Sequence, residues 1–330
     1  MSRKTAMLLG AGLIVPWAAM ASAEPGDLPT YTDAEEAGAD FAVQGEYSGG
    51  LASQDCARKY GIQVIALGDG KFQAVVHRGG LPGDGWEKGD RRSTYEGETK
   101  DGVIVFPGSD GEGRIADGVL TVTNSGGEKL GQLEKVERKS PTLGAKPPEG
   151  AVVLFDGTSA DAFEGGKLTD DKLLAAGCKS RDSFGSVHLH IEFRTPFMPT
   201  AQGQARGNSG VYLQDRYEFQ VLDSFGLEGK DNECGGLYSI QAPRLNMCFP
   251  PLAWQTYDFD FTAPKFDEQG KKMANARVTL KHNGVLVYDD FEIPRLTPGG
   301  LSEEGPTGPI ALQEHGNPVV YRNIWLVEKK

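Results

Sequence analysis

Short segments in which apolar and polar residues alternate recur along this chain, and most of them end in Gly, Asn, Asp or Pro. The 330 residues include 45 Gly and 19 Pro, whereas long stretches with helical periodicity are almost absent. A period of two indicates strands, and frequent turn residues between them are typical of sandwiches and barrels. The sequence therefore predicts an all-β fold, with two short helix candidates at Ala34–Gly38 and Asp170–Ala175.

The strands fall into two groups, separated by a Pro-rich segment. We expect strands at 60–67, 71–77, 103–106 and 119–122, and then at 186–194, 211–214, 217–222, 256–261, 277–282, 285–288, 310–313 and 319–327. Asn283-Gly284 is the strongest hairpin signal. This predicts a small β domain of unknown role at 24–140, a semi-rigid linker at 141–150 and a jelly-roll sandwich at 151–330.

The first 23 residues have the features of a secretory signal peptide. Arg3 and Lys4 precede an uncharged apolar run, and Ala21-Ser22-Ala23 forms a small-x-small cleavage pattern. An uncleaved anchor is the alternative, although the run is short for a membrane span. We therefore expect an exported protein, periplasmic or extracellular, without stable membrane insertion.

The charge of the chain argues against nucleic acid as a partner. The net charge is −12, and it becomes −14 once the two basic residues of the predicted signal peptide are removed. A protein of this charge repels nucleic acid and anionic lipid surfaces. A neutral substrate fits better.

The strand around Glu218 carries the most informative polar pattern. Glu218 and Gln220 share one face, roughly 7 Å apart, while Tyr217, Phe219 and Val221 fill the other. A carboxylate beside an amide suits the recognition of sugar hydroxyls. A second carboxylate, Asp223 or Glu233, would allow acid–base catalysis. The alternative is that this face is the solvated outer face of a sandwich.

Three further motifs allow both a functional and a structural interpretation. His188, His190 and Glu192 alternate on one strand and could bind a metal, or could simply form a surface pattern. Asn208, in a Gly-rich turn, could orient a ligand or cap the turn. His315, also in a turn, could act as a general acid or base near neutral pH, or could bond the backbone.

The cysteines indicate structure rather than catalysis. An oxidising compartment permits disulfides, and Cys234 and Cys248 would close a short loop, so we expect them to form a bridge. None of the four cysteines has the Cys-x-x-Cys spacing of a zinc or thioredoxin-type site. The chain also lacks a Gly-x-Ser-x-Gly nucleophile elbow and a nucleotide-binding fingerprint.

From residue 150 onward the motifs occur in a specific order. They are Val153–Gly157, Leu189–Arg194, Gly207–Leu213, Tyr217–Ser224, Asn232–Gly235, Trp254–Asp258, His282–Gly284, Gly308–Gly316 and Tyr321–Trp325. This series resembles the bacterial 3-keto-disaccharide hydrolase family, whose members are also described as 3-keto-glucoside lyases and 2-hydroxy-glucal hydratases. The resemblance implies a concanavalin-like jelly roll with a carbohydrate site on its concave sheet.

The resemblance also implies roles for particular side chains. Glu218 would remove a proton from the sugar, Arg194 and Gln220 would stabilise the resulting charge, and Glu233 and His315 would protonate the leaving oxygen. Further substrate-binding candidates are Asn208, Tyr212, Asp223 and Gln313. A divalent metal is possible, and no other cofactor is indicated. A non-catalytic carbohydrate-binding protein of the cell envelope and a purely structural domain remain as alternatives.

Overall fold

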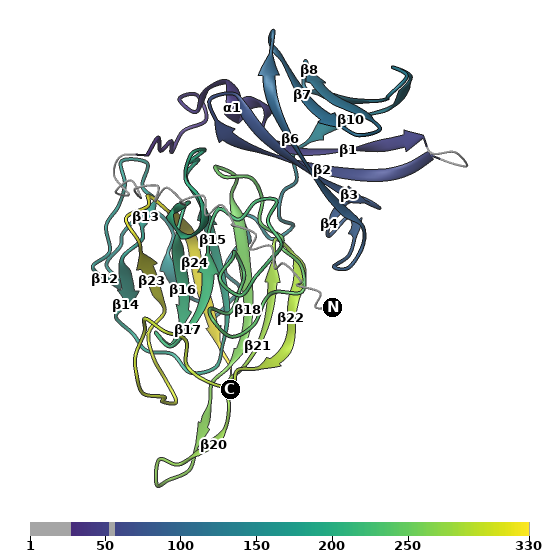
Figure 1. The fold of residues 1–330 in the computed structure, drawn as a ribbon. Helices are drawn as coiled ribbons and strands as arrows, with labels where there is room; N and C mark the ends of the chain where they lie inside the picture. Colours follow the sequence, from purple (N-terminus) through teal and green to yellow (C-terminus); the bar gives the residue numbers. More distant parts are fainter. Residues whose placement is uncertain (1–27, 53–56, 330) are drawn as a thin grey trace, which may run out of the picture.

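The computed structural model describes residues 28–52 and 57–329. The predicted signal peptide and Cys56 lie outside the described residues. Figure 1 shows a barrel, coloured purple to blue, above a two-sheet sandwich in teal to yellow. Nearly all regular structure is strand, which confirms the predicted all-β fold. No helix in the described ranges is long and apolar enough to cross a membrane.

The N-terminal part is a closed barrel of eight antiparallel strands, in the order β1-β10-β9-β8-β7-β6-β3-β2. Most neighbours pair along much of their length, but β6 pairs with β7 only from Glu98↔Val105 to Lys100↔Val103. The strands are β1 (Gly45–Ala52), β2 (Ala57–Gly68), β3 (Lys71–Arg78), β6 (Arg92–Lys100), β7 (Val103–Gly108), β8 (Gly111–Ala116), β9 (Val119–Asn124) and β10 (Lys129–Val136). Two short strands, β4 (Leu81–Pro82) and β5 (Gly85–Trp86), lie in the β3–β6 connection.

The C-terminal part is a sandwich of two sheets. The seven-stranded sheet contains β11 (Val152–Phe155), β24 (Val320–Glu328), β15 (Val187–Arg194), β18 (Gln255–Thr262), β21 (Arg277–His282) and β22 (Val285–Glu292), with β13 (Leu174–Ala175) paired to β24. The five-stranded sheet has the order β12 (Phe163–Glu164), β14 (Cys178–Ser180), β23 (Ala311–Glu314), β16 (Ser209–Leu213) and β17 (Tyr217–Val221). A separate hairpin pairs β19 (Lys265–Phe266) with β20 (Lys272–Ala274).

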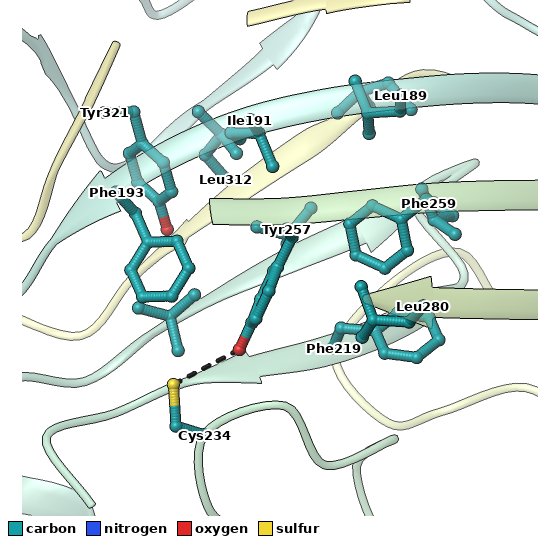
Figure 2. Close-up of a cluster of buried hydrophobic side chains, with 14 of the residues drawn as sticks. Leu189, Ile191, Phe193, Phe219, Cys234, Tyr257, Phe259, Leu280, Leu312 and Tyr321 are labelled. Atoms are coloured by element: carbon teal, nitrogen blue, oxygen red, sulfur yellow. Dashed lines mark hydrogen bonds between the residues drawn. The ribbon is translucent and has the colours of Figure 1, made fainter. Parts of the chain in front are cut away.

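The core of the sandwich lies between the inner faces of these sheets. Leu189, Ile191 and Phe193 of β15 point inward, as the alternation predicts, and meet Phe219 and Leu312 of the other sheet (Figure 2). All five side chains are buried. Removing a buried aromatic ring such as Phe219 typically costs about 3–5 kcal/mol, so this core holds the two sheets in a fixed relation.

The loop after β17 covers the free edge of the five-stranded sheet. The amides of Gly235 and Tyr238 donate to the carbonyls of Gln220 and Glu218, and the amide of Gln220 donates to the carbonyl of Gly236. Strand β17 is therefore hydrogen-bonded along both of its edges, to β16 on one side and to this loop on the other.

The Pro-rich linker is not a free spacer but is docked on the outer face of the seven-stranded sheet. Thr142 Oγ1 donates to Asp258 (2.6 Å), and the amide of Gly144 donates to Glu192 (2.6 Å). The carbonyl of Ala145 accepts from Asn323 Nδ2 (2.9 Å). These bonds fix the segment that connects the barrel to the sandwich.

Both helix candidates are wrong in position or type. A short helix, α1, spans Gly38–Val43, whereas residues 34–36 form a turn. The segment Asp170–Ala175 is a turn that leads into β13, because Lys172 adopts a left-handed φ of 59°. Thr169 closes this turn, since its carbonyl accepts from the Lys172 amide and its hydroxyl accepts from the Leu173 amide.

Candidate active site

Glu218 lies in the middle of β17, on the face that points away from the sandwich core. The hairpin β16–β17 places Tyr212 opposite Glu218 and Gly210 opposite Gln220. Loops cover this face, and Glu218 is only 2% exposed. The interpretation of this strand as a solvated outer face is therefore wrong, because its polar side chains are buried.

Gly210 provides the space that the Glu218 carboxylate occupies. A Cβ atom at Gly210 would lie 2.5 Å from Glu218 Oε1, which is far inside van der Waals contact. Gln220 and Gln313 pair with Gly210 from the two neighbouring strands. We call Gly210, Tyr212, Glu218, Gln220 and Gln313 the Glu218 cluster, since they gather a carboxylate, two amides and a phenol around a glycine.

The hydroxyl of Tyr212 links Glu218 to a covering loop. Its oxygen lies 2.8 Å from Glu218 Oε2 and 2.9 Å from the carbonyl oxygen of Pro298, and it accepts from Gln313 Nε2 at 3.1 Å. A phenol has one proton, so Tyr212 can donate to Glu218 or to Pro298 but not to both. A protonated Glu218 can itself donate to Tyr212, which then donates to Pro298.

Burial raises the pKa of Glu218 from 4.5 to about 7, although the hydrogen bond from Tyr212 acts in the opposite direction. Removing a carboxylate from water disfavours its charged form, and no cation among the described residues forms an ion pair with it. A carboxyl group with a pKa near 7 is half ionised at neutral pH. It can therefore accept and return a proton under these conditions.

A second group of polar side chains lies beside the Glu218 cluster, in the loop before β16 and just after β17. Gln220 Nε2 donates to Gln204 Oε1 (2.7 Å), and Asn208 Nδ2 donates to the carbonyl of Gln204 (2.8 Å). Arg206 Nε donates to Asp223 in a buried ion pair of 2.6 Å. Asn208 thus caps the local turn, as its structural interpretation predicts. Asp223 holds Arg206 in place and does not serve as the second acid–base carboxylate that the sequence suggested.

Several buried polar atoms in these two groups have no partner among the residues that the structure describes. They are Gln220 Oε1, Gln313 Oε1, Asn208 Oδ1 and Arg206 Nη2. Unpaired buried polar atoms are costly and rare in folded proteins. Such a set, on one sheet face beside a carboxyl group of raised pKa, is what a ligand rich in hydroxyl groups would satisfy.

The two predicted proton donors do not join Glu218. The carboxylate of Glu233 accepts from the amides of Gly229 (2.6 Å) and Lys230 (3.0 Å), which places it within its own loop. His315 is exposed in the turn after β23. Of the three residues predicted to be catalytic, only Glu218 therefore lies in the Glu218 cluster.

Arg194 lies in the other sheet. It follows Phe193 of β15 on the outer face of the seven-stranded sheet, where its guanidinium sits 5.2 Å from the centre of the Trp254 ring. The outer faces of the two sheets lie on opposite sides of the sandwich, so Arg194 cannot share a substrate with Glu218 in this arrangement.

The His190 and Glu192 pair binds the linker instead of forming a metal site. His190 Nδ1 lies 2.6 Å from Asp258, and Arg322 Nε donates to Glu192 at 2.7 Å. Burial would raise the pKa of Glu192, but hydrogen bonds from His190, Asn323 and Arg322 outweigh it and lower the pKa to about 2. Within the described ranges, no group of three or more His, Cys, Asp or Glu side chains is placed to hold a metal ion.

The predicted disulfide is not formed. Cys234 and Cys248 are free, buried thiols. Cys234 contacts the hydroxyl of Tyr257 at 3.3 Å, as drawn in Figure 2, and Cys248 donates to the carbonyl of Leu222 at 3.4 Å. The two thiols also contact each other through a side-chain hydrogen bond, but their sulfurs are not bonded.

Sequence reasoning missed the residues that bury and extend the site. Gln204 and Arg206 come from a loop that includes a 3-10 turn, and Thr297 and Pro298 come from the loop between β22 and β23. The Thr297 hydroxyl accepts from the amide of Glu218 at 2.9 Å. These loops lack periodicity. Only the adjacent Gly-rich segment Gly207–Gly210 indicated that another group lies close to the backbone.

Comparisons with known proteins identify the family to which the C-terminal part is similar. Residues 150–327 match the model of the 3-keto-alpha-glucoside-1,2-lyase-like domain family. A solved structure from Parabacteroides distasonis, assigned as a glycosyl hydrolase, is 32% identical, covers 55% of this chain and 85% of its own, and superposes with a TM-score of 0.51.

A second such structure from this organism is 17% identical over 55% of this chain and 95% of its own, with a TM-score of 0.40. No curated protein matches the chain. With more than half of its length in the family match and its polar residues gathered on one sheet face, this chain is a carbohydrate-active enzyme that belongs to the 3-keto-alpha-glucoside-1,2-lyase-like family.

Proposed function

We propose that the enzyme cleaves 3-keto-glycosides, with Glu218 as the base that removes the C2 proton. The observation that carries this proposal is a carboxyl group with a pKa of about 7, buried on a rigid strand and flanked by two amides. A base held on a strand keeps its position relative to the substrate better than one on a mobile loop.

The chemistry of the substrate explains why one carboxylate suffices for the first step. The ketone at C3 acidifies the hydrogen on C2, so that Glu218 can take this proton and leave an enediolate. The electron pair then forms the C1–C2 double bond while the C1–O bond breaks, and the leaving alkoxide takes a proton from water to become the alcohol. The hydroxide left from that water adds to C1, and Glu218 returns its proton to C2, which gives the 3-keto sugar and restores the carboxylate, so that the net reaction is hydrolysis.

The surrounding side chains suit the charge that develops in this reaction. Gln220 and Gln313 are in register with Gly210, beside the Glu218 carboxylate, and can donate to the enediolate oxygens, which lowers the barrier when donors are positioned in advance. Tyr212 can redirect its single proton toward Glu218 as the latter ionises. Burial keeps the pKa of Tyr212 well above its usual value, so its hydroxyl acts as a neutral donor.

The test uses 4-nitrophenyl 3-keto-α-glucoside and the unoxidised 4-nitrophenyl α-glucoside. Nitrophenolate leaves without protonation, so its release reports proton abstraction rather than the identity of the acid. We expect turnover of the keto compound alone, because only its C2 proton is acidified. Equal turnover of both glycosides would refute the elimination mechanism, and binding of both without turnover would favour a carbohydrate-binding protein.

A further inference from the structure

The barrel is packed at one end and hollow at the other. Near α1 its interior is filled by Tyr47, Val64, Phe72 and Leu133, all of which are buried. At the opposite end lies a cavity of about 290 Å³, bounded by Ile62, Phe106 and Leu120 among others. Eight-stranded barrels of this kind have an interior that either fills with side chains or holds one small ligand.

Small residues at inward-facing positions create this cavity. Ala74 of β3, Ser93 of β6 and Gly113 of β8 all line it. The apolar side chains of Tyr60 and Val76 also line it, and they remain only partly buried. In a core closed by its own side chains such residues would be fully buried, so the apolar wall is left for another molecule to cover.

Two arginines lie at the mouth of the cavity, next to the inward-facing residues of the barrel wall. Arg78 pairs with the inward-facing Tyr60, and the amide of Arg78 donates to the carbonyl of Arg91 at 3.2 Å. Both side chains line the cavity. Neither forms an ion pair within residues 28–52 and 57–329, although the chain as a whole carries a net charge of −12.

The carboxylates at this mouth do not neutralise the two arginines. Asp110 and Glu112 lie in the β7–β8 hairpin that forms another part of the wall. Glu112 is paired with Arg114 at 3.2 Å, and Asp110 is exposed. The mouth therefore combines an apolar interior with two cations that an anionic group can reach.

We propose that the barrel binds a small organic anion with an apolar body, which packs against Ile62, Phe106 and Leu120 while its carboxylate meets Arg78 and Arg91. At about 30 Å³ for each group the size of a water molecule, the cavity accommodates roughly ten non-hydrogen atoms. Octanoate has this size and this distribution of charge. This site is separate from the Glu218 cluster and does not depend on the proposed reaction.

Calorimetric titration of the full chain with octanoate, 1-octanol and octylammonium tests the proposal. We expect one octanoate per chain, bound at least 10-fold more tightly than either analogue. Gly113→Leu should reduce octanoate affinity at least 10-fold, because a Cβ there meets Phe106 and Leu120 at ordinary contact distances and the longer side chain fills the cavity. Thr121→Leu, next to the strand partner of Gly113, points outward and should leave binding unchanged.

The double variant Arg78→Gln/Arg91→Gln lies outside the packed core and tests the anion contact separately. It should reduce octanoate affinity at least 10-fold and leave octanol affinity unchanged. The proposal is overturned if the parent binds neither octanoate nor octanol, if both bind equally well, or if folded Gly113→Leu protein binds octanoate as the parent does.

Discussion

Replacing Glu218 by Gln should make the protein more stable at alkaline pH while it removes the activity. Gln has nearly the same shape as Glu and can still accept from Tyr212, so the covering loops keep their contacts. It cannot accept a proton from the sugar, however, and it never carries a charge. The substitution therefore separates the proposed catalytic role of Glu218 from its role in packing.

The size of the effect on stability follows from the pKa of Glu218. Its rise from 4.5 to about 7 corresponds to about 3 kcal/mol, because one pKa unit is worth about 1.36 kcal/mol. The folded state favours the neutral form. The stability that the folded state gains from the protonated Glu218 side chain is fully present below pH 4.5 and is lost as the pH rises through 7. The advantage of the Gln variant should therefore grow between these values and stay constant above pH 7.

The effect on activity has the opposite direction. About half of the Glu218 side chains are ionised at pH 7, so kcat/KM of the parent should rise with pH and level off above pH 8. Loss of a general base costs roughly 100-fold or more, and we expect at least this loss for Glu218→Gln toward 4-nitrophenyl 3-keto-α-glucoside. Because parent and variant are compared at each pH, the titration of other groups cancels.

The assay combines nitrophenolate release with urea unfolding at pH 4.5 and pH 8.5. The matched control is Glu164→Gln, an exposed carboxylate in the same sheet, which should change neither quantity. Parent-like turnover by Glu218→Gln would refute its role as base. A loss of stability at pH 8.5 in parallel with activity would instead show that the carboxylate is needed for the fold.

Three further variants test separate parts of the structure. Gly210→Ala should lower kcat/KM at least 10-fold, because the new methyl group would lie 2.5 Å from Glu218 Oε1 and displace it; parent-like kinetics would contradict this. Tyr212→Phe should move the midpoint of the pH–rate profile upward, because the hydrogen bond from Tyr212 lowers the pKa of Glu218 and its removal lets this pKa rise; an unchanged midpoint would count against this role of Tyr212. Glu192→Gln should cost about 1–3 kcal/mol at pH 7, measured by urea unfolding, because the buried carboxylate that accepts from the partly exposed Arg322 is replaced by a neutral amide. With a Glu192 pKa of about 2, the stability that this carboxylate gives is present above pH 4.5 and lost toward pH 2, so the difference between parent and variant should shrink on acidification.

The sequence predicted the strands better than the surfaces that cover them. The strand expected at 186–194 is observed as β15, from Val187 to Arg194, because its alternation is uninterrupted. The Asn283-Gly284 turn was also predictable, since both residues adopt left-handed φ angles of 50° and 78° that suit Asn and Gly. Local pattern was sufficient in both cases.

The burial of Glu218 depends on contacts that no local pattern encodes. Thr297 bonds Glu218 and Gln204 bonds its neighbour Gln220, each from a loop at least 16 residues away in sequence. The His190 and Glu192 pattern failed as a metal signal for the same reason, because its partners are Asp258, Arg322 and the docked linker. Barrel closure likewise depends on the pairing of β1 with β10, the first and the last strand of the barrel in sequence, which no local pattern predicts.

The loop that pairs with β17 has a consequence for the behaviour of the protein at high concentration. The strand Tyr217–Val221 would otherwise present an open edge with one wholly apolar face and a single carboxyl group, which is only half ionised at pH 7. Open edges of this composition can recruit strands from other molecules and start aggregation. By bonding the carbonyls of Glu218 and Gln220, the segment Gly235–Tyr238 blocks that route. The protein can therefore keep a strand of low charge at the border of its sheet and remain protected from self-association there.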